Sequence, residues 1–391
     1  MGKRGRLPAP DSLRQFNFFS CPRIPVRWRY AGILFLLLLI ACQNGEFTRV
    51  EDSPVIDSLL DAAPHFVANT DTQPERWVAT TRLGLSNDSL ILGRPSHTIA
   101  IGDSVYISEQ GGTTIFAVGA DGYLRRKIGR QGKGPVEFSH IDGLEYNGSH
   151  VFVLDNPRVQ VLTETFEYVD SFFAVGLPMG GFSVSPDYMF LPCPGDVSAP
   201  EGDWLICVRS ASPQHDWIPD IELLPTLDLP NQSGENGNVV TITPDGGRIA
   251  LAYHGLPYIF VYDDQFRHLR TIRFEGKQVQ NFQPSGFPGA AGIELPVGVE
   301  GFTQHFIRTL KFINSRYLIA DVSKGGGGGD YIFDVSEDDY RLAKKKINFR
   351  PMNDPEERGD IHADDYLLHG EHLYVSSQWH EYVYGYPFNL E

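Results

Sequence analysis

A short apolar strand pattern occurs six times in this chain of 391 residues and limits what the chain can fold into. Each copy has six residues, begins with a polar residue and continues with residues that favour extended backbone. The copies are Ser104–Glu109, His150–Asp155, Asp187–Pro192, Arg248–Tyr253, Arg316–Asp321 and His372–Ser377. Successive copies lie 37 to 68 residues apart, which leaves room for four short strands and their turns in each unit.

The first unit shows the internal organisation most clearly. Its expected strands are His97–Ile101, Ser104–Glu109, Thr114–Val118 and Leu124–Ile128. They are joined by segments such as Gly102-Asp103, which supply the residues that tight hairpins need. The fourth unit repeats the arrangement with Val239–Ile242, Arg248–Tyr253, Tyr258–Tyr262 and Leu269–Phe274, and no amphipathic helical period interrupts either unit. The sequence therefore predicts an all-β fold, a six-bladed β-propeller of four-stranded antiparallel blades.

The last unit has only three strand-like segments before the chain ends, so it lacks one strand. Trp77–Leu83 precedes the first unit and belongs to no unit of its own, so we expect this N-terminal strand to complete the last blade and close the ring. The predicted propeller covers residues 76–391. Residues 211–237 and 276–303, rich in Pro, Gly, Asn and Gln, are expected to be insertions, with a small second domain as the alternative.

The N-terminal segment has the order of an export signal. Three arginines precede the apolar run Ala31–Ile40, and Leu39-Ile40-Ala41-Cys42 follows directly. At about 1.5 Å per residue the run spans about half of the roughly 30 Å hydrocarbon core, which is too short for a stable transmembrane helix. The segment resembles bacterial lipoprotein signal peptides. The resemblance implies a signal peptide over residues 1–41, cleaved before Cys42, where the lipid is attached.

The export signal also sets expectations for location. Residues 42–75 have no sustained period and are expected to form a flexible tether. Gln43 follows the cysteine, and by analogy with enterobacterial sorting this favours the outer membrane of a Gram-negative cell envelope. The alternatives are a short membrane anchor and a secreted protein with an incidental cysteine.

Charge restricts the partners. The chain has a formal charge of −16, and the part after residue 41 has −22. Such acidity repels phosphate backbones, so nucleic acid is not expected as a partner. Cations, neutral glycans, peptides and basic protein surfaces remain.

A glycine-rich segment also resembles that of a known family. Gly129–Phe138 (GRQGKGPVEF) follows Asp121–Leu124 (DGYL), and Leu90–Gly93 (LILG) stands earlier in the chain. Together with the lipobox, these segments resemble the NHL-like six-bladed propeller lipoproteins of Bacteroidetes and their relatives. The resemblance implies the propeller fold and a lipid anchor. It implies no activity, because most members have none assigned.

The same segment is a candidate binding loop. In a propeller, the connections that enter the innermost strands lie around the mouth of the central channel. Glycines there allow backbone N–H groups to face an anion or a carbonyl. The candidate residues are Gly129, Arg130, Gly132, Lys133 and Gly134. The alternative is a structurally required corner between the first two blades.

Histidines form a second candidate site. His140 and His362 each fall eleven residues before the second residue of their unit's repeated strand, His305 falls twelve before and His97 eight before. Some NHL-like lyases build a metal site from histidines of different blades, so the resemblance makes His140, His305 and His362 candidate ligands for zinc or another divalent metal. The alternative is ordinary surface or channel histidines, because a shift of one residue turns a strand side chain to the opposite face.

Cys193 and Cys207 lie in segments expected to form neighbouring antiparallel strands, so they are predicted either to form a disulfide or to be two buried thiols. Trp204, Trp217 and Trp379 fall in or near expected loops, as sugar- or peptide-stacking residues or as packing residues. No nucleophile-elbow or zinc-protease motif is present. The sequence thus favours a membrane-anchored, non-catalytic propeller without a cofactor that binds a peptide, glycan or protein. The alternative is a metal-dependent lyase or hydrolase with a histidine-lined channel.

Overall fold

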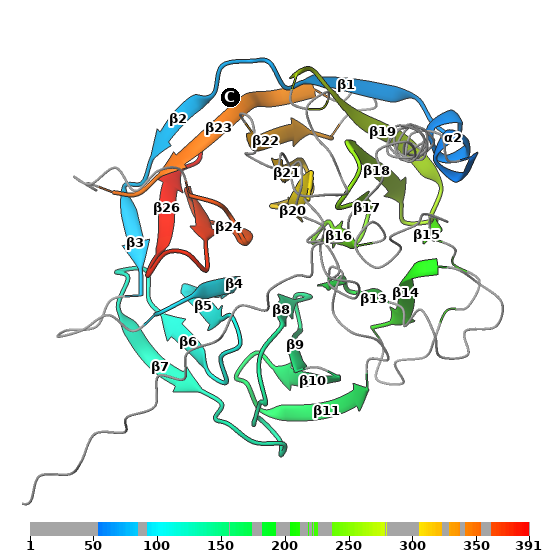
Figure 1. Ribbon diagram of the computed structural model, residues 1–391. Helices are drawn as coiled ribbons and strands as arrows, with labels where there is room; N and C mark the ends of the chain where they lie inside the picture. The colour runs from blue at the N-terminus through cyan, green and yellow to red at the C-terminus, as the bar shows by residue number, and fades with distance from the viewer. Residues whose placement is uncertain are drawn as a thin grey trace, which may run out of the picture. The chain divides into compact units, whose positions relative to one another are not determined.

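The computed structural model describes residues 54–84, 92–155, 157–173, 182–192, 204–211, 218, 221, 223–225, 237–277, 279, 305–322, 328–336, 341–352 and 361–390. They all fall within Val50–Glu391, which forms one compact unit. Six sheets stand around a central axis in this unit (Figure 1). The prediction of a six-bladed β-propeller with four-stranded antiparallel blades is therefore confirmed.

Each blade runs from an innermost strand beside the axis to an outermost strand at the rim. Blade one has, in this order, β4 (Pro95–Ile101), β5 (Ser104–Glu109), β6 (Ile115–Val118) and β7 (Leu124–Ile128). Blade two has β8 (Gly143–Tyr146), β9 (His150–Asp155), β10 (Arg158–Thr163) and β11 (Tyr168–Phe173). Blade three has β12 (Ser183–Val184), β13 (Tyr188–Pro192), β14 (Trp204–Ser210) and β15 (Leu223–Pro225).

The second half of the ring repeats the pattern. Blade four has β16 (Asn238–Ile242), β17 (Arg248–Tyr253), β18 (Tyr258–Asp263) and β19 (His268–Glu275). Blade five has β20 (Ile307–Phe312), β21 (Tyr317–Val322), β22 (Gly329–Asp334) and β23 (Arg341–Arg350). Blade six has β24 (Asp365–His369), β25 (His372–Ser376), β26 (Val383–Pro387) and β3 (Thr81–Leu83).

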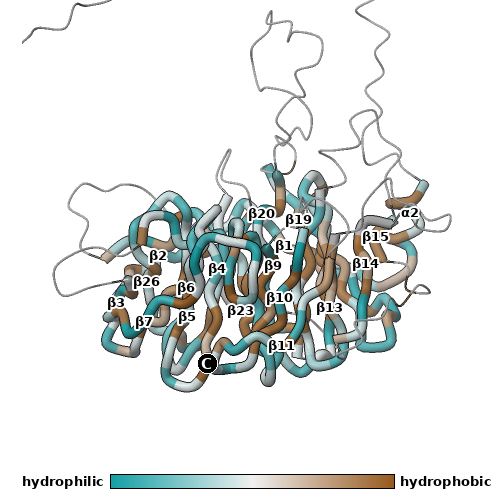
Figure 2. The backbone as a smooth tube through the Cα atoms, turned by 90° about the horizontal axis from the view of Figure 1, so that it is seen from below, coloured by the Kyte–Doolittle hydropathy of each residue, from teal (hydrophilic) through white to brown (hydrophobic). Residues whose placement is uncertain are grey.

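The six repeated segments of the sequence are the second strands of the six blades, β5, β9, β13, β17, β21 and β25. They are apolar along most of their length because each lies within a sheet and between two neighbouring blades. In the described part of the chain the buried apolar residues form six clusters, each between adjacent blades. Hydrophobic residues concentrate in the strands, and the turns are hydrophilic (Figure 2).

The chain before blade one forms an N-terminal strap along the outside of the ring (Figure 1). Helix α2 (Pro54–Asp61) packs Ile56 against the core between blades three and four. Strand β1 (His65–Asn69) then pairs in parallel with β19, and β2 (Glu75–Val78) pairs in parallel with β23. Strand β3 pairs antiparallel with β26, so blade six is closed by the N-terminal segment as expected.

The strap corrects two expectations. Residues 54–75 are not a flexible tether, because hydrogen bonding to blade four and burial of Ile56 fix them on the ring. The expected single strand over Trp77–Leu83 is two strands, since β2 serves blade five and only β3 serves blade six. Residues 1–53, which include the predicted signal and Cys42, lie outside the described residues.

The expected insertion at 211–237 also needs correction. It contains β15, the outermost strand of blade three, which pairs with β14. Its Leu223 and Leu224 are buried, which holds the strand on the ring although it has only three residues. Most of residues 276–303 lies outside the described residues. No helix in the described part of the chain is long and apolar enough to cross a membrane.

The two faces of the ring have different connections. Turns between the first and second strands of the blades have only two to five residues. The connections that enter the innermost strands have nine to 31 residues. We call the face with these longer connections the mouth face. The turns between second and third strands lie on the same face, because strand direction alternates within each blade.

Candidate functional site

An ion pair crosses the axis of the ring. The ammonium nitrogen Nζ of Lys311 in β20 lies 2.6 Å from Oε1 of Glu145 in β8 and 3.6 Å from Oδ1 of Asp365 in β24. The other oxygen of Asp365 accepts hydrogen bonds from the backbone N–H and the hydroxyl of Thr98 in β4, at 2.8 and 3.0 Å. Four of the six innermost strands therefore meet in one polar cluster.

Burial and pairing act in opposite directions on these groups. Burial raises the pKa of Glu145, and the nearby Lys311 charge opposes that effect. Burial lowers the pKa of Lys311, but the carboxylates of Asp365 and Glu145 outweigh it and hold the pKa well above its ordinary value. The ammonium is consequently charged at neutral pH and anchors both carboxylates.

Arg308 is the second residue of β20 and lies nearer the mouth face than Lys311 does. Its guanidinium lies 3.7 Å from Oδ2 of Asp321 and 3.9 Å from Oδ1 of Asp364. Both separations exceed hydrogen-bond distance, and the side chain of Arg308 is 26% exposed. Burial raises the pKa of Asp364.

The mouth continues from Arg308 to an exposed tryptophan. Asp364 accepts hydrogen bonds from the backbone N–H of Gln378 at 2.5 Å and from its side-chain amide at 3.1 Å. Trp379 follows, in the turn between β25 and β26, and is 71% exposed. A tryptophan this exposed leaves a large apolar ring in water, as is common where aromatic side chains stack on ligands.

Three histidines lie near Arg308 and the axial ion pair. The rings of His254 and His305 stack with centroids 4.2 Å apart, and Nδ1 of His254 donates a hydrogen bond of 2.6 Å to the carbonyl of Ile307. Burial lowers the pKa of His254 to about 4, and burial also lowers the pKa of His305. His97 in β4 has its pKa lowered by burial.

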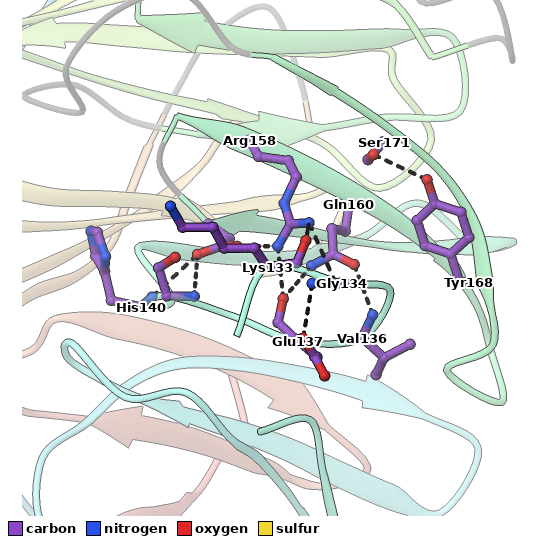
Figure 3. A network of polar contacts seen from close by, with 11 residues as sticks. Lys133, Gly134, Val136, Glu137, His140, Arg158, Gln160, Tyr168 and Ser171 are labelled. Carbon is purple, nitrogen blue, oxygen red and sulfur yellow. Dashed lines mark hydrogen bonds and ion pairs between the residues drawn. The ribbon is translucent and has the colours of Figure 1, made fainter. Parts of the chain in front are cut away.

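The candidate binding loop forms a closed corner between blades one and two (Figure 3). Glu137 occupies its interior, where one carboxylate oxygen accepts hydrogen bonds from Arg130 at 2.9 and 2.6 Å. The other oxygen accepts from the backbone N–H of Gly134 at 2.9 Å. Within the loop, a carboxylate of the same chain thus takes the position that an external anion would take.

Blade two holds the outside of this corner. The guanidinium of Arg158 donates to the carbonyls of Lys133 and Glu137, each at 2.7 Å, and lies 2.5 Å from Oδ2 of Asp155 (Figure 3). The other Asp155 oxygen accepts from the backbone N–H of Ser139 at 2.7 Å. The backbone of Gly129 has a φ of 83°, and a Cβ there would overlap the ring of Phe138. The described contacts are those of a structural corner.

The three predicted metal ligands are found in different blades and have different surroundings. His140 pairs with Asp142 at 2.9 Å in blade two, whereas His305 stacks on His254 beside blade five. His362 precedes β24 in blade six. Among the described residues, no three His, Cys, Asp or Glu side chains form a group that could hold a metal ion. The structure thus does not combine His140, His305 and His362 into one site.

Of the two cysteines expected to pair, Cys207 lies in β14 opposite Leu191 of β13 and takes part in a disulfide bond. Cys193 lies outside the described residues, so its pairing with Cys207 stays a prediction. Of the other tryptophans expected in or near loops, Trp204 is the first residue of β14, and Trp217 lies outside the described residues.

The sequence reasoning missed the charged residues of the innermost strands. Lys311, Glu145 and Arg308 come from β20 and β8, two strands that are not among the repeated segments. Their signal is a charged side chain inside a short segment of strand-forming residues, as in Ile307–Phe312 (IRTLKF). In a strand that lines the axis, such a residue can meet charged residues of the other innermost strands, as Lys311 meets Glu145.

The fold defines the class of this chain: it is a six-bladed β-propeller with a polar axis. No protein-family model and no curated protein matches its sequence. Solved structures with a similar fold include a Bacteroides fragilis protein described as exported, with 13% identity over 80% of this chain and 88% of that one and a TM-score of 0.45. A DUF4221 family member from Bacteroides vulgatus has 12% identity over 81% and 98% of the two chains and a TM-score of 0.45.

A further similar structure is PorZ, a surface component of the type IX secretion system of Porphyromonas gingivalis. It has 10% identity over 73% of this chain and 31% of its own, with a TM-score of 0.38. These descriptions belong to those proteins.

Proposed function

We propose that this protein is a non-catalytic binding propeller, held in the cell envelope by lipid on Cys42, that engages a peptide, glycan or protein at its mouth face. The observation that supports it most is the arrangement of Arg308, Asp364, Gln378 and Trp379. It combines a guanidinium without hydrogen bonds to described residues with a highly exposed aromatic ring. Such a pairing of a planar donor and a stacking surface suits polar ligands with apolar faces.

The axial ion pair supports binding rather than turnover. Glu145 and Asp365 are carboxylates of two innermost strands, and both are engaged by Lys311. A general base needs a lone pair directed at substrate, and these carboxylates direct theirs at an ammonium. The alternative of a metal-dependent lyase or hydrolase with zinc or another divalent metal has no grouped ligands among the described residues.

The cellular setting is proposed from the sequence. The lipobox at Cys42 and the resemblance to NHL-like propeller lipoproteins support anchoring on the outer membrane of a Gram-negative bacterium. The formal charge of −16 supports partners other than nucleic acid.

The test uses the purified chain from residue 43 onwards. It is applied to arrays of glycans and peptides, and each ligand found is then titrated against Arg308→Ala and Trp379→Ala. We expect each variant to weaken binding at least about tenfold, which corresponds to about 1.4 kcal/mol. Arg316→Ala is the control, because Arg316 pairs with Asp334 on the opposite face. Unchanged binding by both mouth variants, or substrate turnover that depends on mouth residues, would contradict the proposal.

A further inference from the structure

The exposed tryptophan of the mouth face stands on a short, fixed turn. Gln378 and Trp379 are the central residues of a β-turn in which the backbone N–H of His380 donates to the carbonyl of Ser377 at 3.0 Å. The turn is held at its base, because Ser377 is fully buried and the backbone N–H of Gln378 donates to Asp364. The indole ring of Trp379 is thus presented to solvent by a hydrogen-bonded backbone, so little chain entropy is lost when a ligand covers it.

The polar groups beside this turn can both donate and accept hydrogen bonds. The side-chain amide of Gln378 donates one N–H to Asp364 at 3.1 Å, and its carbonyl oxygen accepts from no described residue. The guanidinium of Arg308 lies 3.9 Å from the same carboxylate. Arg308 is the extra residue of a β-bulge between Ile307 and Thr309, a feature that re-aims side chains and is frequent beside functional sites. Two planar groups of this kind can each bind a pair of neighbouring hydroxyls.

The charges at this position favour a neutral ligand. The guanidinium of Arg308 lies within 4.0 Å of the carboxylates of Asp321 and Asp364, which compensate its charge and would repel an added anion. An added cation would meet the guanidinium, and Lys311 follows in the same strand. It would also find few acceptors, because Asp321 is fully buried and both oxygens of Asp364 already accept hydrogen bonds from Gln378. Uncharged hydroxyls, each of which donates and accepts, suit this set of groups.

The ring of Trp379 adds a requirement for a flat apolar surface. A pyranose ring whose substituents are all equatorial has such a surface, because axial C–H groups cover both of its faces while its hydroxyls project from the edge. We propose, building on the proposed function, that the ligand is a neutral β-linked glycan of such gluco-configured rings. One ring stacks on Trp379, and hydroxyls of the glycan bind the amide of Gln378 and the guanidinium of Arg308.

Three β-1,4-linked tetrasaccharides with the same ring configuration test the charge of the ligand. Cellotetraose is neutral, the glucosamine tetramer is cationic and the glucuronic acid tetramer is anionic. Each is titrated calorimetrically, at physiological salt, into the purified chain from residue 43 onwards. We expect cellotetraose to bind at least about fivefold more tightly than either charged tetramer. In NMR spectra, the axial protons of one sugar ring should shift upfield on binding, because the indole ring current shields protons above its face.

Variants test the two contacts separately. Trp379→Ala should remove the upfield shift and weaken cellotetraose at least about tenfold, and Trp379→Phe should weaken it less. Arg308→Lys keeps the charge but lacks the planar pair of donors, and should weaken cellotetraose at least about fivefold. Phe173→Ala is the matched control, because Phe173 is 69% exposed and lies at the rim of blade two, and it should leave the affinity unchanged. Thermal unfolding checks that each variant folds.

Three results would overturn this assignment of the ligand. They are no binding of cellotetraose at about 10 mM, tighter binding of either charged tetramer, and an affinity that Trp379→Ala leaves unchanged. The broader proposal of a binding propeller would survive them if a peptide or protein ligand lost affinity in Arg308→Ala and Trp379→Ala. It would fail with them if no ligand of any class depended on these two residues.

Discussion

The ammonium of Lys311 in blade five lies 2.6 Å from the carboxylate of Glu145 in blade two, although 166 residues separate them in sequence. The two blades stand three positions apart in a ring of six, so the contact joins opposite sides. Both side chains are less than 20% exposed, and water screens the pair little. The innermost strands of the ring are thus linked across the axis as well as to their neighbours.

Removing the ammonium should destabilise the ring. Lys311→Met leaves Glu145 and Asp365 buried without their cation, and we expect a loss of about 3 kcal/mol in the free energy of unfolding, measured with urea. Adding Glu145→Gln should recover part of this loss. Arg125→Met is the control, because its pair with Asp121 is about half exposed and should contribute far less to stability than the buried pair. A Lys311→Met loss no larger than that of the control would contradict the expectation.

Acid should destabilise the fold through His254. Burial lowers its pKa to about 4 in the folded state, against an ordinary value of about 6.5 in the unfolded chain. The unfolded state therefore binds more protons between these values, so stability falls as pH decreases from about 6.5 to about 4. The full effect is about 3 kcal/mol. Urea unfolding across this range should show a smaller loss for His254→Gln, and an NMR titration of His254 near pH 6.5 would refute the assignment.

The corner between blades one and two should tolerate no side chain at Gly129. Gly129→Ala adds a methyl group that overlaps the buried ring of Phe138, at a backbone φ of 83°. Gly148 is a matched control, because its φ is 89° and no heavy atom lies within 4 Å of the position that a Cβ would take there. We expect Gly148→Ala to cost about 1 kcal/mol of unfolding free energy and Gly129→Ala at least about 1 kcal/mol more. Equal losses would show that the ring of Phe138 moves aside freely.

The disulfide of Cys207 should close a short loop in blade three. If Cys193 is its partner, the Cys193→Ser and Cys207→Ser variants should each lose about 3 kcal/mol, and their losses should not add. Peptide mapping by mass spectrometry without reductant should recover the two cysteines in one linked species. Alkylation of both thiols before reduction would rule the pairing out.

Lipid attachment should depend on Cys42 alone. Cys42→Ser should abolish incorporation of labelled palmitate in a Gram-negative host and release the propeller from the membrane fraction. Cys21→Ser, which alters the segment before the apolar run, should leave labelling unchanged. Labelling that survives Cys42→Ser would contradict the lipobox assignment.

The strands of the ring were largely predictable, because each of the six second strands is a short, nearly continuous apolar run, as expected for a strand in a sheet that is buried on both faces. The N-terminal strap was not. Strand β1 has five residues, of which only Ala68 is buried, so its extended form depends on pairing with β19. Helix α2 spans eight residues and needs the core between blades three and four to hold it. The sequences of β1 and α2 therefore do not by themselves distinguish a strand or a helix from a polar linker.

The candidate site was predictable only in outline. The position of His305 and His97 near the axis follows from the repeat, but their interactions do not. Whether His305 meets a metal or the ring of His254 depends on where the connections beside β17 and β20, in different blades, place these two side chains. The partnership of Lys311 with Glu145 likewise exists only after the ring has closed. The glycines of the corner segment predict a loop that binds a ligand. In the structure, the carboxylate of Glu137 from the same segment accepts the hydrogen bonds that such a ligand would accept.

The N-terminal strap also determines the order in which the ring would come apart under tension. A pull applied ahead of residue 54 reaches α2 first, then the parallel pairing of β1, then that of β2, and only afterwards β3. The strand that closes blade six is therefore the last of the four elements to bear the load. The N-terminal strap therefore bears a force applied at the N-terminal end before β3 does. It protects the closed ring from that force.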